Sequence, residues 1–373
     1  MSAPQTAGEP AAEPTNVSLF QPITLGSRTF RNRLWLSPMC QYSAEDGVPG
    51  QWHVVHLGAR AKGGFGLIFA EATAISPEAR ISLGDTGLWN DSQEQAWQDI
   101  VDFVHERGAR IGIQLSHAGR KASLRTPWHT EPGALPIEDG GWTPLSASPI
   151  AFPGSTEPTQ ATGAQLQRIV EDFAASAVRA RGAGFDVVEI QAGHGFLLHS
   201  FLSPLSNERT DHYGGSLPNR ARLLLDVVDA VKEVLGATGP SLFVRLSATD
   251  WLEHGLTVHD SAEISQWLRE RGVDLVDVSS GGLLPAEIPL GSGYQVPLAQ
   301  HLRAKAEVPV AAVGLITSPQ EAEEIVASGT ADAVFVGRAG LADPSFGLRA
   351  AHELGHQAAE QLWQKQYVRA IWK

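Results

Sequence analysis

Short apolar runs recur along the whole chain, each followed by turn residues and then by a stretch with helical periodicity. Runs such as LFVRLS (242–247) and ADAVFVGR (331–338) are apolar nearly throughout and do not alternate. This pattern is typical of parallel strands that are buried on both faces. We predict eight strands of this kind, at 34–39, 66–72, 110–115, 186–190, 242–246, 275–278, 310–313 and 333–336.

Helical periodicity fills the segments between these runs. The strongest candidates are 94–107, 166–181, 219–235, 261–271 and 319–328, the last beginning with Ser318 before Pro319. Eight strands that alternate with helices predict a (β/α)8 TIM barrel, folded as a single domain over 17–373. A doubly wound open sheet is the alternative, and it is disfavoured because no Gly-x-Gly-x-x-Gly motif follows the first strand.

One long connection interrupts this alternation after the third predicted strand. Segment 121–163 is rich in Pro, Gly, Trp and Ser. A loop of this length in a compact domain often forms a lid over a functional site. A solvated surface insertion is the alternative interpretation.

Composition and charge narrow the class of partner. The 41 acidic side chains outnumber the 28 basic ones, for a formal net charge of −13. This balance argues against nucleic acid and against an anionic membrane surface. Hydrophobic residues make up 43% of the chain, enough to fill a large core, yet no apolar run is long enough to cross a bilayer. Composition and charge therefore disfavour nucleic acid and membrane as partners.

The single cysteine, Cys40, excludes an internal disulfide and a thiolate metal cluster, and it suits a reducing, cytoplasmic compartment. Segment 1–16 carries two glutamates, no lysine or arginine and no apolar core. It does not have the pattern of a signal peptide, and we expect a disordered tail.

The ends of the last two predicted strands carry a candidate phosphate site. Gly314 and Gly337 follow these strands, and Arg338 comes next. Exposed backbone N–H groups and a cation at this end of a barrel commonly hold a phosphate. The alternative is that each glycine only allows a tight turn between a strand and the following helix.

Arg245 lies in the middle of a predicted buried strand. A charge in that position needs a partner or a ligand, because burying it alone costs several kcal/mol. Gln114, at the end of another apolar strand, offers both a donor and an acceptor. We expect these two side chains to contact the edge of a polar heterocycle, although each alone is also explained as a satisfied core group.

Two further polar residues end the fourth predicted strand. Gln191 and His194 are three residues apart, and as neutral donors they are expected to converge on one carbonyl oxygen. A metal site is disfavoured there, because glutamine is a poor ligand. Cys40 is a candidate nucleophile, but a buried inert cysteine is the more frequent case.

Taken together, these motifs resemble the old yellow enzyme family of FMN-dependent ene-reductases, over essentially all of the chain from Leu19 onward. Cys40, Tyr42 and the C-terminal QYVRAIW are similar to the subgroup named after its thermophilic members. The resemblance rests on LFQPITLGSRTFRNRLWLSPMCQYS, GLIFAEATAISPEAR, IGIQLSHAGRKAS, GFLLHSFLSPLSNERTDHYGGSLPNR and VPVAAVGLITSPQEAEEIVASGTADAVFVGRAGLADP.

The resemblance implies a set of FMN contacts. Cys40 is expected near the isoalloxazine, Arg245 near its N1/C2 edge, and Gly314, Gly337 and Arg338 at the phosphate. The full implied set is Ser37, Pro38, Met39, Cys40, Ala72, Gln114, Arg245, Gly314, Gly337 and Arg338.

The resemblance also implies an assembly. Arg369 matches an arginine that reaches the neighbouring subunit's active site in this subgroup, and Tyr367 and Trp372 flank it. We therefore expect segment 360–373 to form an interface in a homodimer or a larger even oligomer.

The chain departs from the family pattern at the substrate site. The family has His, then His or Asn three residues later, and then a proton-donating Tyr, whereas this chain has Gln191, His194 and Phe196. Gln191 retains an amide donor, but Phe196 has none.

The implied function is reduction of the activated C=C bond of an α,β-unsaturated carbonyl compound. FMN would take hydride from NADPH or NADH in a ping-pong reaction, with Gln191, His194 and Tyr42 on the substrate oxygen. A flavin-dependent desaturase or isomerase is one alternative. A flavin-binding protein with a decayed substrate site is the other.

Overall fold

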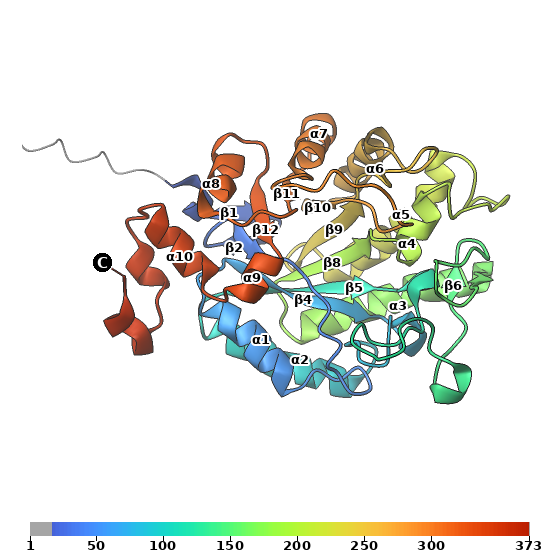
Figure 1. Cartoon of the computed structure of the whole chain (residues 1–373), viewed down its shortest axis with the longest axis horizontal. Coiled ribbons are helices and arrows are strands. Elements are labelled where there is room, and N and C mark those ends of the chain that lie inside the picture. Colours follow the sequence, from blue (N-terminus) through green and yellow to red (C-terminus); the bar gives the residue numbers. More distant parts are fainter. Residues whose placement is uncertain (1–16, 373) are drawn as a thin grey trace, which may run out of the picture.

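The computed structural model describes residues 17–372, and the expected tail 1–16 lies outside them. Eight parallel strands close into a barrel in the order β10, β11, β12, β3, β4, β5, β8, β9 (Figure 1). The predicted TIM barrel is confirmed and the open sheet is excluded. The strands are β3 (Leu34–Leu36), β4 (Leu67–Ala74), β5 (Arg110–Ser116), β8 (Val187–Ala192), β9 (Ser241–Ser247), β10 (Leu275–Ser279), β11 (Val310–Ala312) and β12 (Ala333–Val336).

Helices surround the barrel, and the five predicted ones are present. Side-chain caps at Asn90, Thr162, Thr257 and Ser318 begin four of them. None of the helices within 17–372 is both long and apolar enough to span a membrane. The predicted helices are α2 (Asp91–His105), α3 (Gly163–Gly182), α5 (Leu217–Leu235), α6 (Val258–Glu270) and α8 (Pro319–Ala327).

Five further α-helices were not predicted. Helix α1 buries His53, His56 and Arg60, so its inner face does not show as an apolar stripe in the sequence. Helices α4 and α9 have six and five residues, too few for a periodic pattern. The unpredicted helices are α1 (Gln51–Ala61), α4 (Leu197–Leu202), α7 (Val296–Ala306), α9 (Arg338–Ala342) and α10 (Phe346–Glu353).

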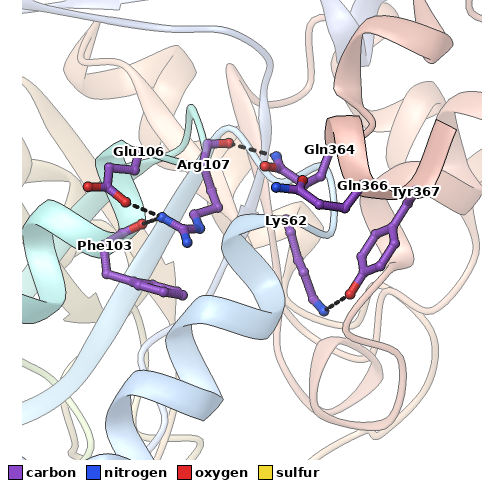
Figure 2. Close-up of a pocket in the computed structure, with 7 residues that line it drawn as sticks. All are labelled: Lys62, Phe103, Glu106, Arg107, Gln364, Gln366 and Tyr367. Atoms are coloured by element: carbon purple, nitrogen blue, oxygen red, sulfur yellow. Dashed lines mark hydrogen bonds and ion pairs between the residues drawn. The ribbon is translucent and has the colours of Figure 1, made fainter.

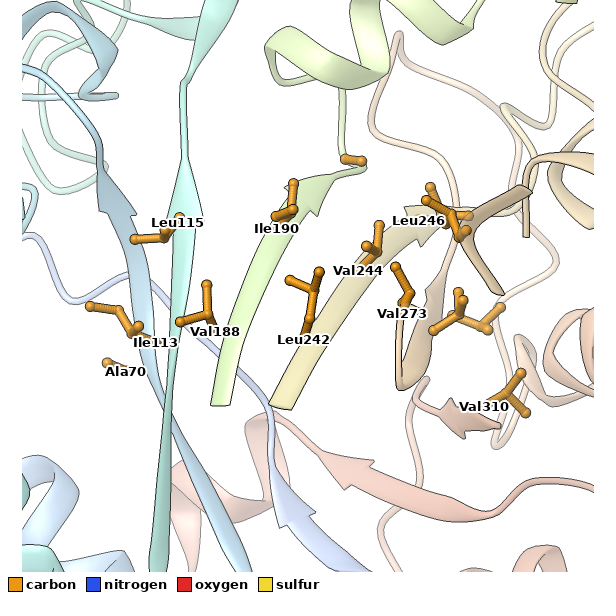
Figure 3. Close-up of a cluster of buried hydrophobic side chains, with 14 of the residues drawn as sticks. Ala70, Ile113, Leu115, Val188, Ile190, Leu242, Val244, Leu246, Val273 and Val310 are labelled. Atoms are coloured by element: carbon orange, nitrogen blue, oxygen red, sulfur yellow. The ribbon is translucent and has the colours of Figure 1, made fainter. Parts of the chain in front are cut away.

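The hydrophobic core has two layers. Side chains of the strands, including Ile113, Val188 and Val244 (Figure 3), belong to a large cluster that they share with buried side chains of the helices. A second cluster fills the barrel itself, where the rings of Trp35 and Phe335 lie 5.4 Å apart. The aromatic members of this inner cluster are Phe30, Trp35, Phe69, Phe243 and Phe335.

A short antiparallel hairpin precedes the barrel. Its strands are β1 (Ile23–Leu25) and β2 (Arg28–Phe30). Leu25 and Phe30 are buried in the inner cluster, and the Phe30 ring lies 5.3 Å from that of Trp35. The hairpin thus covers the amino-terminal end of the barrel with apolar side chains.

The segment between β5 and α3 contains the short strands β6 (Leu145–Ser146) and β7 (Thr159–Gln160). Near its beginning, the Trp128 ring lies edge-on to Tyr42 at 5.7 Å, although 65% of Trp128 is exposed. One end of this segment therefore lies beside the Cys40–Tyr42 loop.

The C-terminal segment ends in two 3-10 helices, Ala359–Leu362 and Lys365–Ala370. Lys62 Nζ donates to the Tyr367 hydroxyl at 3.0 Å, and Gln364 Nε2 donates to the Arg107 carbonyl at 3.2 Å (Figure 2). These contacts seat the segment beside the ends of α1 and α2 and enclose a surface pocket of about 570 Å³.

Candidate active site

Strand register gathers polar side chains at the carboxyl end of the barrel. One row across neighbouring strands runs from Ala72 to Gln114 to Glu189. A second row runs from Gln191 to Arg245 to Asp277. Gln114, Glu189, Gln191, Arg245 and Asp277 are all buried. Residues far apart in the sequence therefore meet in one polar layer above the aromatic core.

A chain of hydrogen bonds orders the first part of this layer. Gln114 Nε2 donates to Glu189 Oε1 at 2.7 Å, and Gln191 Nε2 donates to Gln114 Oε1 at 3.2 Å. Gln191 Nε2 also lies 3.4 Å from His194 Nδ1. Because an amide nitrogen can only donate, this contact favours the His194 tautomer that carries its proton on Nε2.

The chain of bonds changes the role expected for Gln191. Its amide nitrogen faces Gln114 and His194, and its Oε1 accepts the Gly193 N–H at 2.9 Å. The expectation that both Gln191 and His194 donate to one carbonyl does not match this arrangement. Both amide protons face acceptors within the protein, Gln114 Oε1 and His194 Nδ1.

His194 is held in an uncommon backbone conformation with φ +56°. Its N–H donates to Ser247 Oγ at 2.9 Å, and its carbonyl accepts from Lys121 Nζ at 2.7 Å. Burial lowers the pKa of His194 well below its ordinary value, and Arg245, Lys121 and His199 lower it further. The imidazole is therefore neutral at pH 7.

Arg245 has the partner that its burial required. Its Nε lies 3.2 Å from Asp277 Oδ2, outside the alignment of a hydrogen bond, and its Nη1 donates to Ser37 Oγ at 3.1 Å. Burial raises the pKa of Glu189 to about 8, with a further rise from Asp277, and burial raises the pKa of Asp277 to about 6. Arg245 opposes both shifts, so one cation faces two buried carboxyl groups.

A cavity of about 410 Å³ opens beside Arg245. Gly314 has φ +130°, which only glycine adopts easily. A Cβ on Gly337 would have only Met39 Sδ within 4 Å, at 3.8 Å, so the backbone is open to the cavity there. The predicted residues that line it are Ser37, Pro38, Met39, His194, Arg245, Gly314, Gly337 and Arg338.

Arg60 holds the far end of α9, the helix that begins after Gly337. Its Nε donates to the Gly340 carbonyl at 3.1 Å and its Nη2 to the Leu341 carbonyl at 3.0 Å. Nη1 donates to the His56 carbonyl on its own helix at 2.9 Å. A buried side chain of α1 thus joins this helix to α9, whose first residue, Arg338, lies in the cavity wall.

Cys40 and Tyr42 lie in a neighbouring cluster with Phe196. Glu71 supports their loop, because it accepts the Gln41 N–H at 2.7 Å and contacts His53 Nε2 at 3.0 Å. Burial raises the pKa of the Cys40 thiol, and the Asp85 and Glu71 carboxylates raise it further. The thiol is therefore protonated at neutral pH, which argues against a nucleophilic role.

Arg369 is not part of the cavity in its own chain. It lies in the exposed 3-10 helix Lys365–Ala370. Among residues 17–372, no cluster of His, Cys, Asp and Glu has the arrangement of a metal site.

Sequence reasoning missed Glu189, Asp277 and Lys121. The two acids stand in the apolar strand segments DVVEIQA and LVDVS, where a charge is as unusual as Arg245 is in its own strand. That signal was available. Lys121 gave no signal, since its hydrogen-bond partners His194 and Gly282 are 73 and 161 residues away.

Sequence comparison with known families finds a match over residues 18–357 to the NADH:flavin oxidoreductase / NADH oxidase family. The chain belongs to this family. It is an NAD(P)H-dependent flavin oxidoreductase of the old yellow enzyme type, with FMN as its cofactor. The NADPH dehydrogenase of Bacillus cytotoxicus is 44% identical over 357 residues, which are 95% of this chain and 97% of that protein.

Solved structures agree with this family assignment. Morphinone reductase is 32% identical with a TM-score of 0.77, and the match covers 91% of this chain and 90% of that one. Its complex with tetrahydroNAD is 31% identical with a TM-score of 0.75. A 2-naphthoyl-CoA reductase complex has a TM-score of 0.82 at 24% identity, over 90% of this old yellow enzyme-type chain and 52% of that longer one. The last likeness concerns the fold alone.

Proposed function

We propose that this enzyme reduces the activated C=C bond of α,β-unsaturated carbonyl compounds with hydride from NADPH or NADH. The observation that carries the proposal is the neutral, oriented imidazole of His194 in the wall of the cavity that Arg245 and Gly337 also line. A neutral donor aimed at a carbonyl oxygen stabilises the negative charge that develops there when hydride adds to the β-carbon.

The residues present fit FMN. The open backbone at Gly337 and the cation of Arg338 suit a phosphate, and Arg245 provides positive charge for an isoalloxazine edge that becomes anionic on reduction. The cavity lies within the size range of cofactor sites. Bound FMN supplies hydride transfer between the nicotinamide and a carbon acceptor. We assign the remaining contacts to Ser37, Pro38, Met39, Cys40, Ala72, Gln114 and Gly314.

The substrate oxygen is assigned to His194. Its Nε2–H donates, while Gln191 fixes the tautomer through Nδ1 and Ser247 and Lys121 hold the backbone. Tyr42 assists from the neighbouring cluster as a protonated phenol, because burial and the Cys40, Asp85 and Glu71 groups raise its pKa. This substrate set is preorganised, which supports a working reductase over a flavin protein with a decayed site.

We also propose a homodimer in which Arg369 acts across the interface. The C-terminal segment leaves Tyr367, Val368 and Trp372 between 42% and 55% exposed. Helix α1, whose end Tyr367 contacts through Lys62, leaves Trp52 and Val55 55% and 67% exposed. Apolar side chains exposed in this way are typical of an interface between subunits.

Anaerobic stopped-flow absorbance tests the function in two half-reactions. NADPH should bleach the flavin, and 2-cyclohexenone should then restore its absorbance with formation of cyclohexanone. Bleaching by cyclohexanone, with 2-cyclohexenone as product, would instead support the desaturase. A reduced flavin that no enone reoxidises would support the decayed site and contradict the proposal.

A truncation that ends at Gln366 tests the assembly. The parent should sediment as a dimer, and the truncated chain should lose enone turnover while it keeps its flavin. A parent that sediments as a monomer with full turnover would exclude any role of Arg369 in trans.

A further inference from the structure

Reduction of an enone needs a proton as well as a hydride, and this inference rests on the proposed function. Once hydride is on the β-carbon, the α-carbon must take up a proton. Phe196 packs against the same apolar cluster as Cys40 and Tyr42, and its ring has no proton to give. The proton must therefore come from water or from another side chain.

Lys121 provides a cation close to the ring of Phe196. It ends the 3-10 helix Gly119–Lys121, and its Nζ lies 5.8 Å from the centre of the Phe196 ring. Nζ donates to the carbonyl of His194 at 2.7 Å and also to that of Gly282. Both of these residues line the cavity, so the ammonium is in direct contact with two residues of the cavity wall.

The hydrogen bonds leave Lys121 with one proton unassigned. An ammonium group has three N–H donors, and two of them are directed at backbone carbonyls. The ring of Phe152 lies 4.2 Å from Nζ, and rings accept no strong hydrogen bond. The third N–H is thus available to a water molecule or a substrate atom beside the two rings.

The surroundings of Lys121 favour release of this proton. Burial lowers the pKa of Lys121 to about 8, and the positive charge of Arg120 on the same segment contributes to the lowering. The charge of Lys121 in turn helps to lower the pKa of His194, which is neutral. Tyr42 and Cys40 are weaker candidates, because burial and nearby carboxylates raise their pKa values.

We propose that Lys121 is the proton source for the α-carbon, delivering its proton through a water molecule beside the ring of Phe196. An N–H bond of the ammonium breaks and a C–H bond forms at the α-carbon, while NAD(P)H supplies the hydride at the β-carbon. Solvent then reprotonates the neutral amine. The balance is enone plus NAD(P)H plus H⁺ to saturated ketone plus NAD(P)⁺.

The variant K121R separates proton donation from position and charge. Arginine keeps the cation and the donors that hold His194, but it does not release a proton at accessible pH. The double variant K121R/F196Y then adds a phenol at the ring. Both are compared with the parent as FMN-loaded enzymes, in stopped-flow reoxidation by 2-cyclohexenone and in reduction by NADPH.

We expect K121R to slow reoxidation by about 10²-fold or more, which is the usual contribution of a general acid. The double variant K121R/F196Y should be reoxidised at least about tenfold faster than K121R. Reduction by NADPH should stay within about threefold. K121R reoxidised within about threefold of the parent would overturn the proposal. So would a slow K121R that F196Y does not rescue, since that result assigns Lys121 a purely structural role.

A second measurement does not depend on the activity of the variants. The chain has six lysines, so the Cε resonance of Lys121 can be followed by NMR with 13C-labelled lysine and assigned by its absence in K121R. Its titration near pH 8 should match the pH at which parent reoxidation begins to fall. A pH-independent reoxidation rate overturns the role of Lys121, whereas a reduced parent that no enone reoxidises overturns the proposed function itself.

Discussion

Arg245 offers the sharpest test of the electrostatics in the polar layer. Replacing it with Met removes the cation that faces Glu189 and Asp277 while it keeps most of the side-chain volume. Both carboxyl groups are fully buried, and Arg245 is 7% exposed. Removing one partner of a buried ion pair typically costs about 3–5 kcal/mol, because the other charge is left uncompensated. We expect a loss of that size in the free energy of unfolding near pH 8.5.

The loss should depend on pH. Both carboxyl pKa values are raised in the folded state, to about 8 and about 6, so protonation stabilises the fold. This contribution is complete below the ordinary carboxyl pKa and is lost as pH rises through the raised values. Without Arg245 both pKa values should rise further. The difference in the free energy of unfolding between parent and variant should therefore be smallest near pH 5 and largest near pH 8.5.

Urea unfolding of the cofactor-free proteins at both pH values measures the gap without any contribution from flavin binding. Arg303→Met is the matched control, because Arg303 pairs with Asp332 at 3.0 Å while 42% of its side chain is exposed. Removing such an exposed pair should cost less than about 1 kcal/mol. An Arg245→Met loss as small as that of the control, or one that does not change with pH, would refute the reasoning.

Three further predictions concern the site. Trp128→Ala should raise the KM for an enone with a large aryl substituent about three- to tenfold and leave the KM for cyclohexenone unchanged, because the indole stands exposed over Tyr42. Ile137→Ala is its control, because Ile137 lies in the same segment with the same 65% exposure. An equal change in KM for both variants would show that Trp128 does not contact the substrate. Arg60→Met should weaken FMN binding at least about tenfold in a fluorescence titration, since the end of α9 loses its donors, and an unchanged Kd would contradict this. Gln191→Met should raise the KM for cyclohexenone about threefold or more with NADPH reduction unaltered, and an unchanged KM would show that the imidazole orients itself.

The barrel was predictable because its strands are continuous apolar runs. The glycine turns after β11 and β12 were predictable because Gly314 and Gly337 directly follow two of these runs. The β1–β2 hairpin was not, since three-residue strands are too short for a pattern. Helix α1 was missed because His53 and Arg60 form part of its buried face. Each missed element is stabilised by tertiary contacts, and its sequence does not show the hydrophobic periodicity from which helices and strands are predicted.

The site was predictable where one residue was anomalous by itself. Arg245 in an apolar strand required a partner, and the structure supplies Asp277. The identity of that partner depends on strand register, which no single sequence displays. The same holds for Gln191, whose sequence position indicated a donor to substrate, while its neighbours on β5 and in the following loop occupy its amide.

The aromatic cluster that fills the barrel below the polar layer has a consequence for molecular traffic. Within residues 17–372, Phe30 of the hairpin and the rings around Trp35 block the amino-terminal end. In the proposed reaction, nicotinamide and enone then both approach from the opposite end, above His194 and Arg245. The two substrates of the proposed reaction therefore share one entrance and must bind one after the other. High concentrations of either substrate should then inhibit turnover by delaying the other's arrival.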